Sequence, residues 1–361
     1  MLNIFIGFYP WKSLFWKLFN YTIFISNKKN PQKFMKLFEH NKNSNVHIWG
    51  HKISKSYKKA FKNYKIKPSC VEDGFVRSFG LGADFIKPSS IVIDKCGIYY
   101  DSTKISDLED ILSNISLTKE LQLKTKFLIN KIIKNNITKY NIENLKSFNP
   151  FNINKKIIVF AVGQVAKDAS IKYGTFAYKT DLDLIKKVRS NNKEAFIFYK
   201  PHPDVLSGNR VGADLKDITK YADYIASDLS IFNCLKICNE VHTLTSLVGF
   251  DALIRGKKVF TYGAPFYAGW GLTFDMDKTS PAFKRRKRKL SLEELVYGCL
   301  IKYPIYWDYE KNKKTTCENV IRQIVKERDA YWKVNTKSPI EKPYLIRQIK
   351  KGLVLAKSYF V

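Results

Sequence analysis

Glu72 and Asp73 have the residue types that acid–base chemistry needs, and they are adjacent in Val71-Glu72-Asp73-Gly74-Phe75. Two neighbouring carboxylates often raise the pKa of one member, as a general base requires. The simpler interpretation is a turn in which Asp73 hydrogen-bonds to its own backbone before Gly74. The sequence leaves open which of the two acids is the base.

His202 is a second candidate, in Tyr199-Lys200-Pro201-His202-Pro203-Asp204. Prolines on both sides restrict the backbone to extended conformations, which holds the imidazole in one place. A rigid histidine beside Lys200 suits a phosphate or a carboxylate. We predict that Lys200, His202 and Pro203 contact a ligand, whereas His242, inside a predicted strand, is structural.

The segment from Gly163 to Ser170 follows an apolar run that reads as a strand. Its polar side chains should therefore project into the same crevice as His202. Gln164 and Ser170 are predicted to bind the ligand. Asp168 fits three roles: a nucleophile, a ligand for sugar hydroxyls, or a helix N-cap.

The segment over residues 241–250 places Thr245 and Ser246 where a predicted strand turns into a helix. Backbone N–H groups at such a helix start, together with the helix dipole, form an anion site. The alternative is an ordinary N-cap. Gly249 is the small residue of this segment, and Thr245, Ser246 and Gly249 complete the predicted donor-binding set.

The elements that position these residues follow a parallel α/β pattern in the second half of the chain. We predict strands over 156–162, 195–199, 240–244 and 258–262, and helices over 180–190 and 247–254. Ligands of such sheets bind beyond the carboxyl ends of the strands. We expect every candidate segment, including those around Glu72, Gln164, His202 and Thr245, to lie at such an end.

In the first half of the chain, the sequence predicts shorter elements. A strand over 46–50 precedes a basic helix, a strand over 69–71 leads into the turn 72–74, and residues 90–94 and 97–100 form a hairpin. A helix starts at Ser106, with Glu109 completing a capping box, and another covers 117–133. We assign domains to 1–150 and 151–335, joined by a polar connection over 135–154, and a helical tail over 336–361 that packs back across both.

Composition favours two packed domains, because the chain has 361 residues of which 45% are hydrophobic. Lys12, Lys17 and Asn20 interrupt the aromatic N-terminus, so no spanning helix is predicted. Trp16 and Phe19 stand where a secretory signal has small residues, so none is predicted either. The six cysteines suggest neither a disulfide framework nor a metal site and fit a reducing cytoplasm.

The formal net charge of +31, from 63 Lys and Arg against 32 Asp and Glu, favours polyanionic partners. The densest basic run covers residues 284–289. We predict an exposed loop near an acidic substrate or lipid headgroups rather than a nucleic-acid site, because no nucleic-acid motif accompanies it. The alternative is solvated surface charge, since the chain is rich in Lys, Asn and Ile together.

Taken in order, these segments resemble the capsule polysaccharide β-Kdo transferases, the KpsC family, and within it the C-terminal transferase module. The similarity covers about residues 71–307, and its motifs are residues 72–78, Gly97-Ile98-Tyr99-Tyr100-Asp101, Gly163-Gln164, Asp168-Ala169-Ser170, 199–204, Thr245-Ser246 with Gly249-Phe250, and 265–271. The resemblance departs at Lys167, where an acid is expected. Family members also usually carry two transferase modules, and this chain has room for one.

The resemblance implies an α/β, GT-B-like fold with two Rossmann-type domains facing a central cleft. It also implies CMP-Kdo as donor, transfer with retention and a 2,7 linkage to a lipid-linked Kdo acceptor. On that basis we expect Asp168 to be the nucleophile, Asp73 or Glu72 the base, and His202 a phosphate ligand. Arg77 or Arg210 would bind the donor carboxylate, and no metal or cofactor is expected.

The expected location is the cytoplasm, on the anionic inner face of the inner membrane. A separate Kdo transferase module and capsule export proteins are further candidate partners. Two rival hypotheses remain at this point: a transferase of the same fold for CMP-sialic acid or another nucleotide sugar, and a non-catalytic capsule-assembly scaffold. A scaffold has no need for the polar crevice residues, which favours the enzyme.

Overall fold

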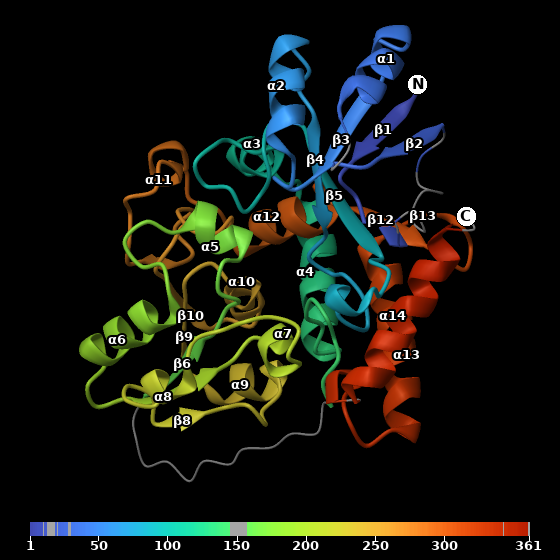
Figure 1. Cartoon of the computed structure of the whole chain (residues 1–361). Helices are drawn as coiled ribbons and strands as arrows, with labels where there is room; N and C mark the ends of the chain where they lie inside the picture. Colours follow the sequence, from blue (N-terminus) through green and yellow to red (C-terminus); the bar gives the residue numbers. More distant parts are fainter. Residues whose placement is uncertain are drawn as a thin grey trace.

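The computed structural model describes residues 1–9, 11–12, 19, 21–27, 30–144, 157–341 and 343–359. They form two lobes, each built on its own β-sheet (Figure 1). The two lobes share one hydrophobic core, in which Phe75 of the first stacks on Phe266 of the second with 4.5 Å between ring centroids. Lys156, where a strand was expected to start, and most of the expected connection over 135–154 lie outside the described residues.

The first lobe has a seven-stranded mixed sheet in the order β13-β12-β5-β4-β3-β1-β2. Its strands are β1 (Asn3–Ile6), β2 (Thr22–Ile25), β3 (Asn45–Trp49), β4 (Ser69–Asp73), β5 (Ser90–Asp94), β12 (Ile305–Asp308) and β13 (Lys313–Thr315). The helices α1 (Gln32–His40), α2 (Lys55–Asn63), α3 (Asp107–Asn114) and α4 (Lys119–Lys134) accompany it. Strands β2, β1, β3 and β4 run parallel, whereas β5 is antiparallel to β4 and to β12.

The second lobe has a six-stranded parallel sheet in the order β11-β10-β9-β6-β7-β8, as the α/β pattern predicted. Its strands are β6 (Ile158–Val162), β7 (Phe196–Lys200), β8 (Tyr224–Ile225), β9 (Glu240–Thr243), β10 (Lys258–Thr261) and β11 (Phe274–Asp275). Its helices are α5 (Ala169–Gly174), α6 (Asp181–Asn191), α7 (Pro203–Leu206), α8 (Leu215–Ile218), α9 (Ile231–Ile237), α10 (Leu247–Ile254), α11 (Ala282–Arg285) and α12 (Leu292–Tyr297).

Two local predictions in the first lobe are wrong. Glu72 and Asp73 do not form a turn, because they extend β4 and pair with Val92 and Ile91 of β5. Residues 97–100 do not return as the second strand of a hairpin. The Asp94 carboxylate accepts hydrogen bonds from the backbone N–H groups of residues 96, 97 and 107, so the chain closes into a loop there.

The chain returns to the first lobe before its end. Strands β12 and β13 lie inside the range 151–335 expected for the second domain, yet they extend the first sheet beyond β5. Helices α13 (Cys317–Val334) and α14 (Tyr344–Tyr359) follow them. The last helix does pack across both lobes, because Lys351 forms an ion pair with Asp84 of the first and Arg347 donates to the carbonyl of Ser207 in the second.

A buried cluster of charge joins the lobes. Ser106 caps α3 by accepting from the Glu109 N–H at 3.0 Å, as predicted. The Glu109 side chain does not complete a capping box and instead binds Arg286 at 3.1 Å and Arg285 at the end of α11. Arg288 donates to the Ile115 carbonyl at 2.7 Å. The basic run is therefore not wholly an exposed loop, because its arginines point inward while its lysines are exposed.

No described helix is both long enough and apolar enough to cross a membrane.

We expect Glu109→Ala to lower the free energy of unfolding by about 3–5 kcal/mol, because it leaves the buried guanidinium of Arg286 unpaired. Urea unfolding of the two proteins measures the difference. Lys287→Ala, which changes an exposed residue of the same run, should stay within about 0.5 kcal/mol of the wild type. Equal stability of Glu109→Ala and the wild type would show that this cluster does not hold the lobes together.

Candidate functional site

Two neighbouring strands of the second sheet, β6 and β9, end at one polar network. Gln164 follows β6 and Thr245 follows β9, and they are joined by two hydrogen bonds. The Thr245 N–H donates to Gln164 Oε1 at 2.8 Å, and Gln164 Nε2 donates to Thr245 Oγ1 at 3.1 Å. The prediction that these two segments meet at the carboxyl ends of the strands is confirmed.

Asp168 belongs to the same network. The backbone N–H and the hydroxyl of Ser170 donate to Asp168 Oδ1 at 2.8 and 2.7 Å, and Thr245 Oγ1 donates to Ser170 Oγ at 3.1 Å. Asp168 is thus the N-cap of α5, one of its three expected roles. Both hydrogen bonds go to Oδ1, so Oδ2 of this half-buried carboxylate accepts none from the described residues and is free for another role.

Lys167, directly before Asp168, has a φ of +63°. This left-handed conformation is uncommon for a residue with a side chain, and such conformations gather at functional sites. It turns the backbone so that Asp168 can cap α5 while the Lys167 side chain stays exposed. The departure from the family pattern at this position therefore changes the surface of the site and leaves the carboxylate in place.

His202 is held as the prolines predicted. It is the N-cap of α7, with Pro203 at the first helical position, and its Nδ1 accepts from the Asp204 N–H at 3.0 Å. Burial lowers the pKa of His202, although the charges of Asp204 and Asp168 oppose this effect. The neutral ring then carries its proton on Nε2, which is a hydrogen-bond donor.

Lys200 is not placed to bind a ligand, so that prediction is wrong. Its buried ammonium donates to the carbonyl of Leu229 and lies 3.9 Å from Glu143 Oε1. Glu143 also accepts from the Ile231 N–H at the start of α9, at 2.5 Å. Lys200 is the final residue of β7, and its side chain points to the α9 side of the sheet, so it fixes the segment that connects the lobes.

Two predicted donor-binding residues at the start of α10, Ser246 and Gly249, have different environments. Ser246 caps the helix, accepting from the Val248 N–H at 3.3 Å, and stays half-buried. Gly249 is covered by Tyr267, since a Cβ on Gly249 would lie 2.2 Å from the Tyr267 hydroxyl. Gly249 therefore serves packing, and the prediction that it binds the donor is wrong. His242 is structural as predicted, stacked on Phe260 at 4.4 Å.

Glu72 is the acid of the first lobe whose pKa lies near neutrality. Burial raises the pKa of Glu72 to about 7, with Lys12 opposing the shift and Asp73 adding to it. The Tyr100 hydroxyl donates to Glu72 Oε1 at 3.5 Å. Gly50, with a φ of +49°, lies beneath this contact, and a Cβ there would be 2.4 Å from Glu72 Oε1.

Asp73 has the opposite environment because Arg77 is its partner. Burial alone would raise the pKa of Asp73, but the Arg77 guanidinium at 2.7 Å and the Lys12 ammonium bring it below its ordinary value. Arg77 is fully buried and also donates to Ser78 Oγ and to the Ile86 carbonyl, each at 2.7 Å. All three of its nitrogens are engaged, so the prediction that Arg77 binds a donor carboxylate is wrong.

Three residues near these acids were not predicted as site residues. The Lys12 ammonium lies over the Trp49 ring, and burial lowers the pKa of Lys12 to about 7 despite Asp73 and Glu72. Burial raises the pKa of Tyr99, and the charges of Glu72 and Asp168 add to this shift. The charges of Glu72 and Asp73 help to raise the pKa of Lys139, and the charge of Lys139 lowers the pKa of His202.

Lys139 is a cation of the first lobe whose charge lowers the pKa of His202 in the second. Burial lowers the pKa of Lys139 itself, but Tyr140, Tyr99, Asp73 and Glu72 together raise it above the ordinary value, so the side chain stays charged. Within the described ranges its ammonium makes no hydrogen bond and no ion pair. The neighbouring backbone is pinned, because Tyr140 O accepts from the Gly80 N–H at 2.9 Å. Only the position of Tyr99 in the Gly97–Asp101 motif hinted at this group from sequence.

Arg210 is exposed, and its charge lowers the pKa of His202. Its backbone N–H donates to the Asp204 carbonyl at 3.0 Å, which holds it beside α7. It remains a predicted ligand for an anionic group. Within the part of the chain that the structure describes, no three His, Cys, Asp or Glu side chains are placed to hold a metal ion.

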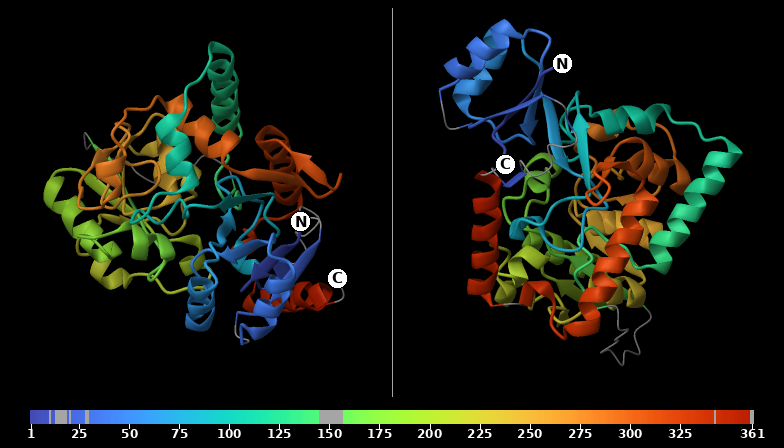
Figure 2. Two further views of the ribbon diagram at one scale, coloured as in Figure 1. Left: turned by 90° about the horizontal axis from the view of Figure 1, so that it is seen from above. Right: turned by 90° about the vertical axis from the view of Figure 1, so that its right-hand side faces the viewer.

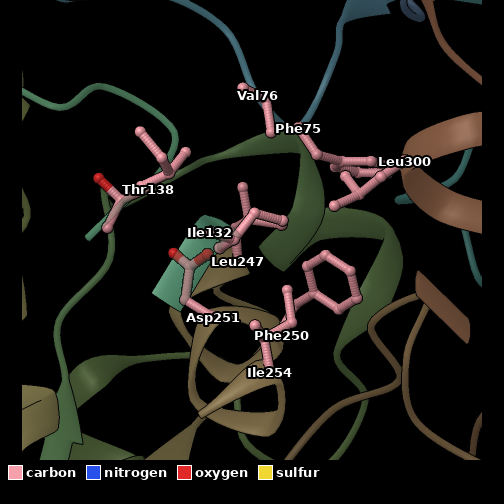
Figure 3. Close-up of a pocket in the computed structure, with 10 residues that line it drawn as sticks. Phe75, Val76, Ile132, Thr138, Leu247, Phe250, Asp251, Ile254 and Leu300 are labelled. Atoms are coloured by element: carbon pink, nitrogen blue, oxygen red, sulfur yellow. The ribbon is translucent and has the colours of Figure 1, made fainter. Parts of the chain in front are cut away.

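A small apolar pocket lies below the site, at the junction of the lobes (Figure 3). Phe75 and Val76, just after β4, line one side, and Leu247 and Phe250 of α10 line another. Burial raises the pKa of Asp251, which also lines the pocket, to about 7. A volume of about 10 Å³ holds about one water molecule, so the pocket supports the site and does not bind the ligand.

Known proteins resemble this chain in sequence and in fold. The family model described as capsule polysaccharide biosynthesis protein matches residues 44–126 and 116–306. The chain is 41% identical over 261 residues to the capsule polysaccharide modification protein LipA of Neisseria meningitidis serogroup B, covering 72% of this chain and 36% of LipA. It therefore spans about a third of the length of that relative.

Two solved structures of Thermosulfurimonas dismutans KpsC are similar over nearly the whole chain. Its β-Kdo 2,7 transferase is 34% identical with a TM-score of 0.73, covering 91% of this chain and 100% of that one. Its β-Kdo 2,4 transferase is 26% identical with a TM-score of 0.71, covering 90% and 98%. The predicted α/β, GT-B-like fold is confirmed.

We expect Arg77→Met to lower the free energy of unfolding at neutral pH by about 3–5 kcal/mol, because Asp73 then keeps a buried charge without a partner. The pair stabilises the wild type above the ordinary Asp pKa of about 3.9, and this contribution is lost as pH falls through the lowered pKa of folded Asp73. The difference between the two proteins should therefore narrow below about pH 4. Thermal unfolding at several pH values measures it.

The control adds Asp73→Asn to Arg77→Met, which removes the unpaired charge. The double variant should recover part of the stability lost at neutral pH and show a flatter pH dependence. A pH-independent difference for Arg77→Met alone would mean that its packing, and not its pairing with Asp73, sets the loss.

Proposed function

The chain belongs to the capsule polysaccharide biosynthesis protein family, and from this premise we propose that it is a glycosyltransferase that moves β-Kdo from CMP-Kdo to a Kdo-containing glycolipid or oligosaccharide. The observation that carries the proposal is that the acids of the two lobes belong to elements in contact: Tyr100, which donates to Glu72, lies 6.5 Å between ring centroids from Tyr173 of α5, the helix that Asp168 caps. The higher identity to the KpsC 2,7 transferase, 34% against 26% for the 2,4 transferase, supports a 2,7 linkage.

The donor phosphate needs its charge stabilised as CMP departs. His202 offers an Nε2–H donor, and the start of α10 offers the N–H of Leu247, since those of Ser246, Val248 and Gly249 are already hydrogen-bonded. Lys139 is a charged side chain with no ion pair among the described residues, and Arg210 is exposed beside His202. We assign to Lys139 and Arg210 the anion-binding role expected of Lys200 and Arg77, since those two are engaged elsewhere.

Asp168 is the proposed nucleophile. Its free Oδ2 attacks the anomeric carbon of Kdo, the bond from that carbon to the phosphate oxygen breaks, and CMP leaves with the electron pair. Ser170 and the Asp168 N-cap geometry keep the carboxylate in one orientation through Oδ1. The acceptor hydroxyl then attacks the same carbon from the other side and releases Asp168. Two inversions give net retention.

Glu72 is the proposed base for the second step, in preference to Asp73. A base accepts a proton best when its pKa is close to the working pH, and the pKa of Glu72 is about 7. Asp73 is held ionised by Arg77, so it orients the site and is a poor proton acceptor. The Tyr100 hydroxyl and the absence of a side chain at Gly50 position Glu72.

The mechanism relies on side-chain cations and a helix start, and we propose it without a metal or another cofactor. A cytoplasmic location is part of the proposal and is supported by the free cysteines, which suit a reducing compartment. The lipid-linked acceptor, a second transferase module and capsule export proteins are proposed partners.

The direct test is transfer from CMP-Kdo to a synthetic Kdo-terminated acceptor, with the linkage read by NMR. Asp168→Ala should lower the rate at least about a thousandfold, because the nucleophile acts as a unit with the rest of the site. Without acceptor, mass spectrometry of the wild type should find one sugar on the peptide that contains Asp168. Asp217→Ala, an exposed acid outside the site, is the matched control and should transfer normally. Full activity of Asp168→Ala would disprove the nucleophile.

The pH dependence tests the base. Because Glu72 must lose its proton, kcat/KM should rise with pH through about 7 and then level off. Glu72→Gln should slow transfer and remove this rising limb, whereas Asp73→Asn should slow transfer and retain the limb. The reverse pattern would assign the base to Asp73.

A further inference from the structure

The last helix, α14, turns its apolar side to solvent. Leu345, Ile346, Ile349 and Leu353 are exposed by 69%, 45%, 56% and 60%. Their spacing places them along one face of the helix. Single exposed apolar side chains are common, but a contiguous row of large ones usually marks an interaction surface. We call these four residues the α14 stripe.

The opposite face of α14 carries the charges that hold it in place. Arg347 is buried and donates to the Ser207 carbonyl at 2.6 Å. Lys351 lies 3.3 Å from Asp84 Oδ1, and Arg347 lies 3.6 Å from the same oxygen. The helix is therefore held to the protein by Arg347 and Lys351, beside which Val354 and Leu355 are half-buried. This orientation leaves the α14 stripe outward.

We propose that the α14 stripe docks on an anionic membrane surface. A helix of 16 residues is about 24 Å long, and an amphipathic helix of this kind lies in the plane of the interface with its apolar face among the acyl chains. Exposed Lys350 stands beside the stripe and reaches the headgroups.

Charge decides between a membrane and a second copy of the chain as the occupant. The net charge of +31 attracts the protein to anionic lipid. Two copies that met through this face would each bring the same positive charge, and such repulsion keeps proteins monomeric. The right-hand view of Figure 2 shows α14 along one edge of the molecule, where a flat surface can reach it.

Docking through α14 would also orient the candidate site relative to the membrane. Ser207, which accepts from Arg347, ends the short helix α7, and His202 is the cap at the start of that helix. Asp84, on the other lobe, completes the attachment. A membrane bound at the stripe would therefore lie next to the rim of the site, where a lipid-linked acceptor enters. This consequence rests on the proposed function, whereas membrane binding itself does not.

The test measures binding of the full chain to vesicles of phosphatidylglycerol and phosphatidylethanolamine by co-flotation, with pure phosphatidylcholine vesicles for comparison. The wild type should bind the anionic vesicles and not the neutral ones. The double variant Ile349→Ser/Leu353→Ser should lower the partition coefficient at least about tenfold, because it removes two inserted side chains. Its melting temperature should not change, since both residues are exposed.

The matched control is Leu123→Ser/Phe127→Ser on α4, at the opposite edge in the same view of Figure 2. These residues are exposed by 68% and 65% and also lie among lysines. The control should bind vesicles as the wild type does. Loss of binding in the control alone, or in neither variant, would overturn the assignment to α14.

Two further measurements separate the possible failures. A dimeric wild type that becomes monomeric in Ile349→Ser/Leu353→Ser, with vesicle binding unchanged, would make the stripe a dimer interface and refute membrane docking. Transfer to a soluble Kdo-terminated acceptor should stay within about twofold in this variant, because the stripe does not touch the site. A wild type without transfer activity would refute the proposed function and leave the vesicle result valid.

Discussion

The buried carboxylate of Glu109 is the contact on which the arrangement of the two lobes depends. It belongs to α3 of the first lobe and binds Arg285 and Arg286 at the end of α11 in the second. Arg286 in turn donates to the carbonyls of Pro265 and Ala268. A charge buried in this way is costly without its partners, so the lobes can approach in few other ways.

The segment that leaves the first lobe is anchored to the second lobe at two points. The Arg255 guanidinium donates to the Ile137 carbonyl at 2.9 Å, and Glu143 binds the start of α9. Lys139 lies between these anchors in the sequence, so the charge that lowers the pKa of His202 is carried by a fixed backbone. Preorganised charge of this kind stabilises a developing anion without reorganising at the moment of reaction.

The adjacent acids show how environment separates two similar groups. Glu72 and Asp73 are both at the end of β4, but successive residues of a strand point to opposite faces. Glu72 faces Tyr100 and the space above Gly50, where burial raises its pKa, whereas Asp73 faces Arg77. Two carboxylates whose pKa values are pushed apart can take different roles, here a proton acceptor and a fixed charge.

The sequence by itself determined the parallel sheet of the second lobe, the N-cap at Ser106 and the rigid histidine at position 202, because hydrophobic period, capping residues and proline act locally. It also placed Gln164 and Thr245 at one sheet edge. Only the tertiary structure decided what each charged side chain contacts: Arg77 and Lys200 turned inward, Arg285 and Arg286 joined the lobes, and Lys139 came near enough to His202 to lower its pKa. Local pattern cannot predict these contacts, since a charge finds its partner across a long stretch of chain and only packing brings the two together.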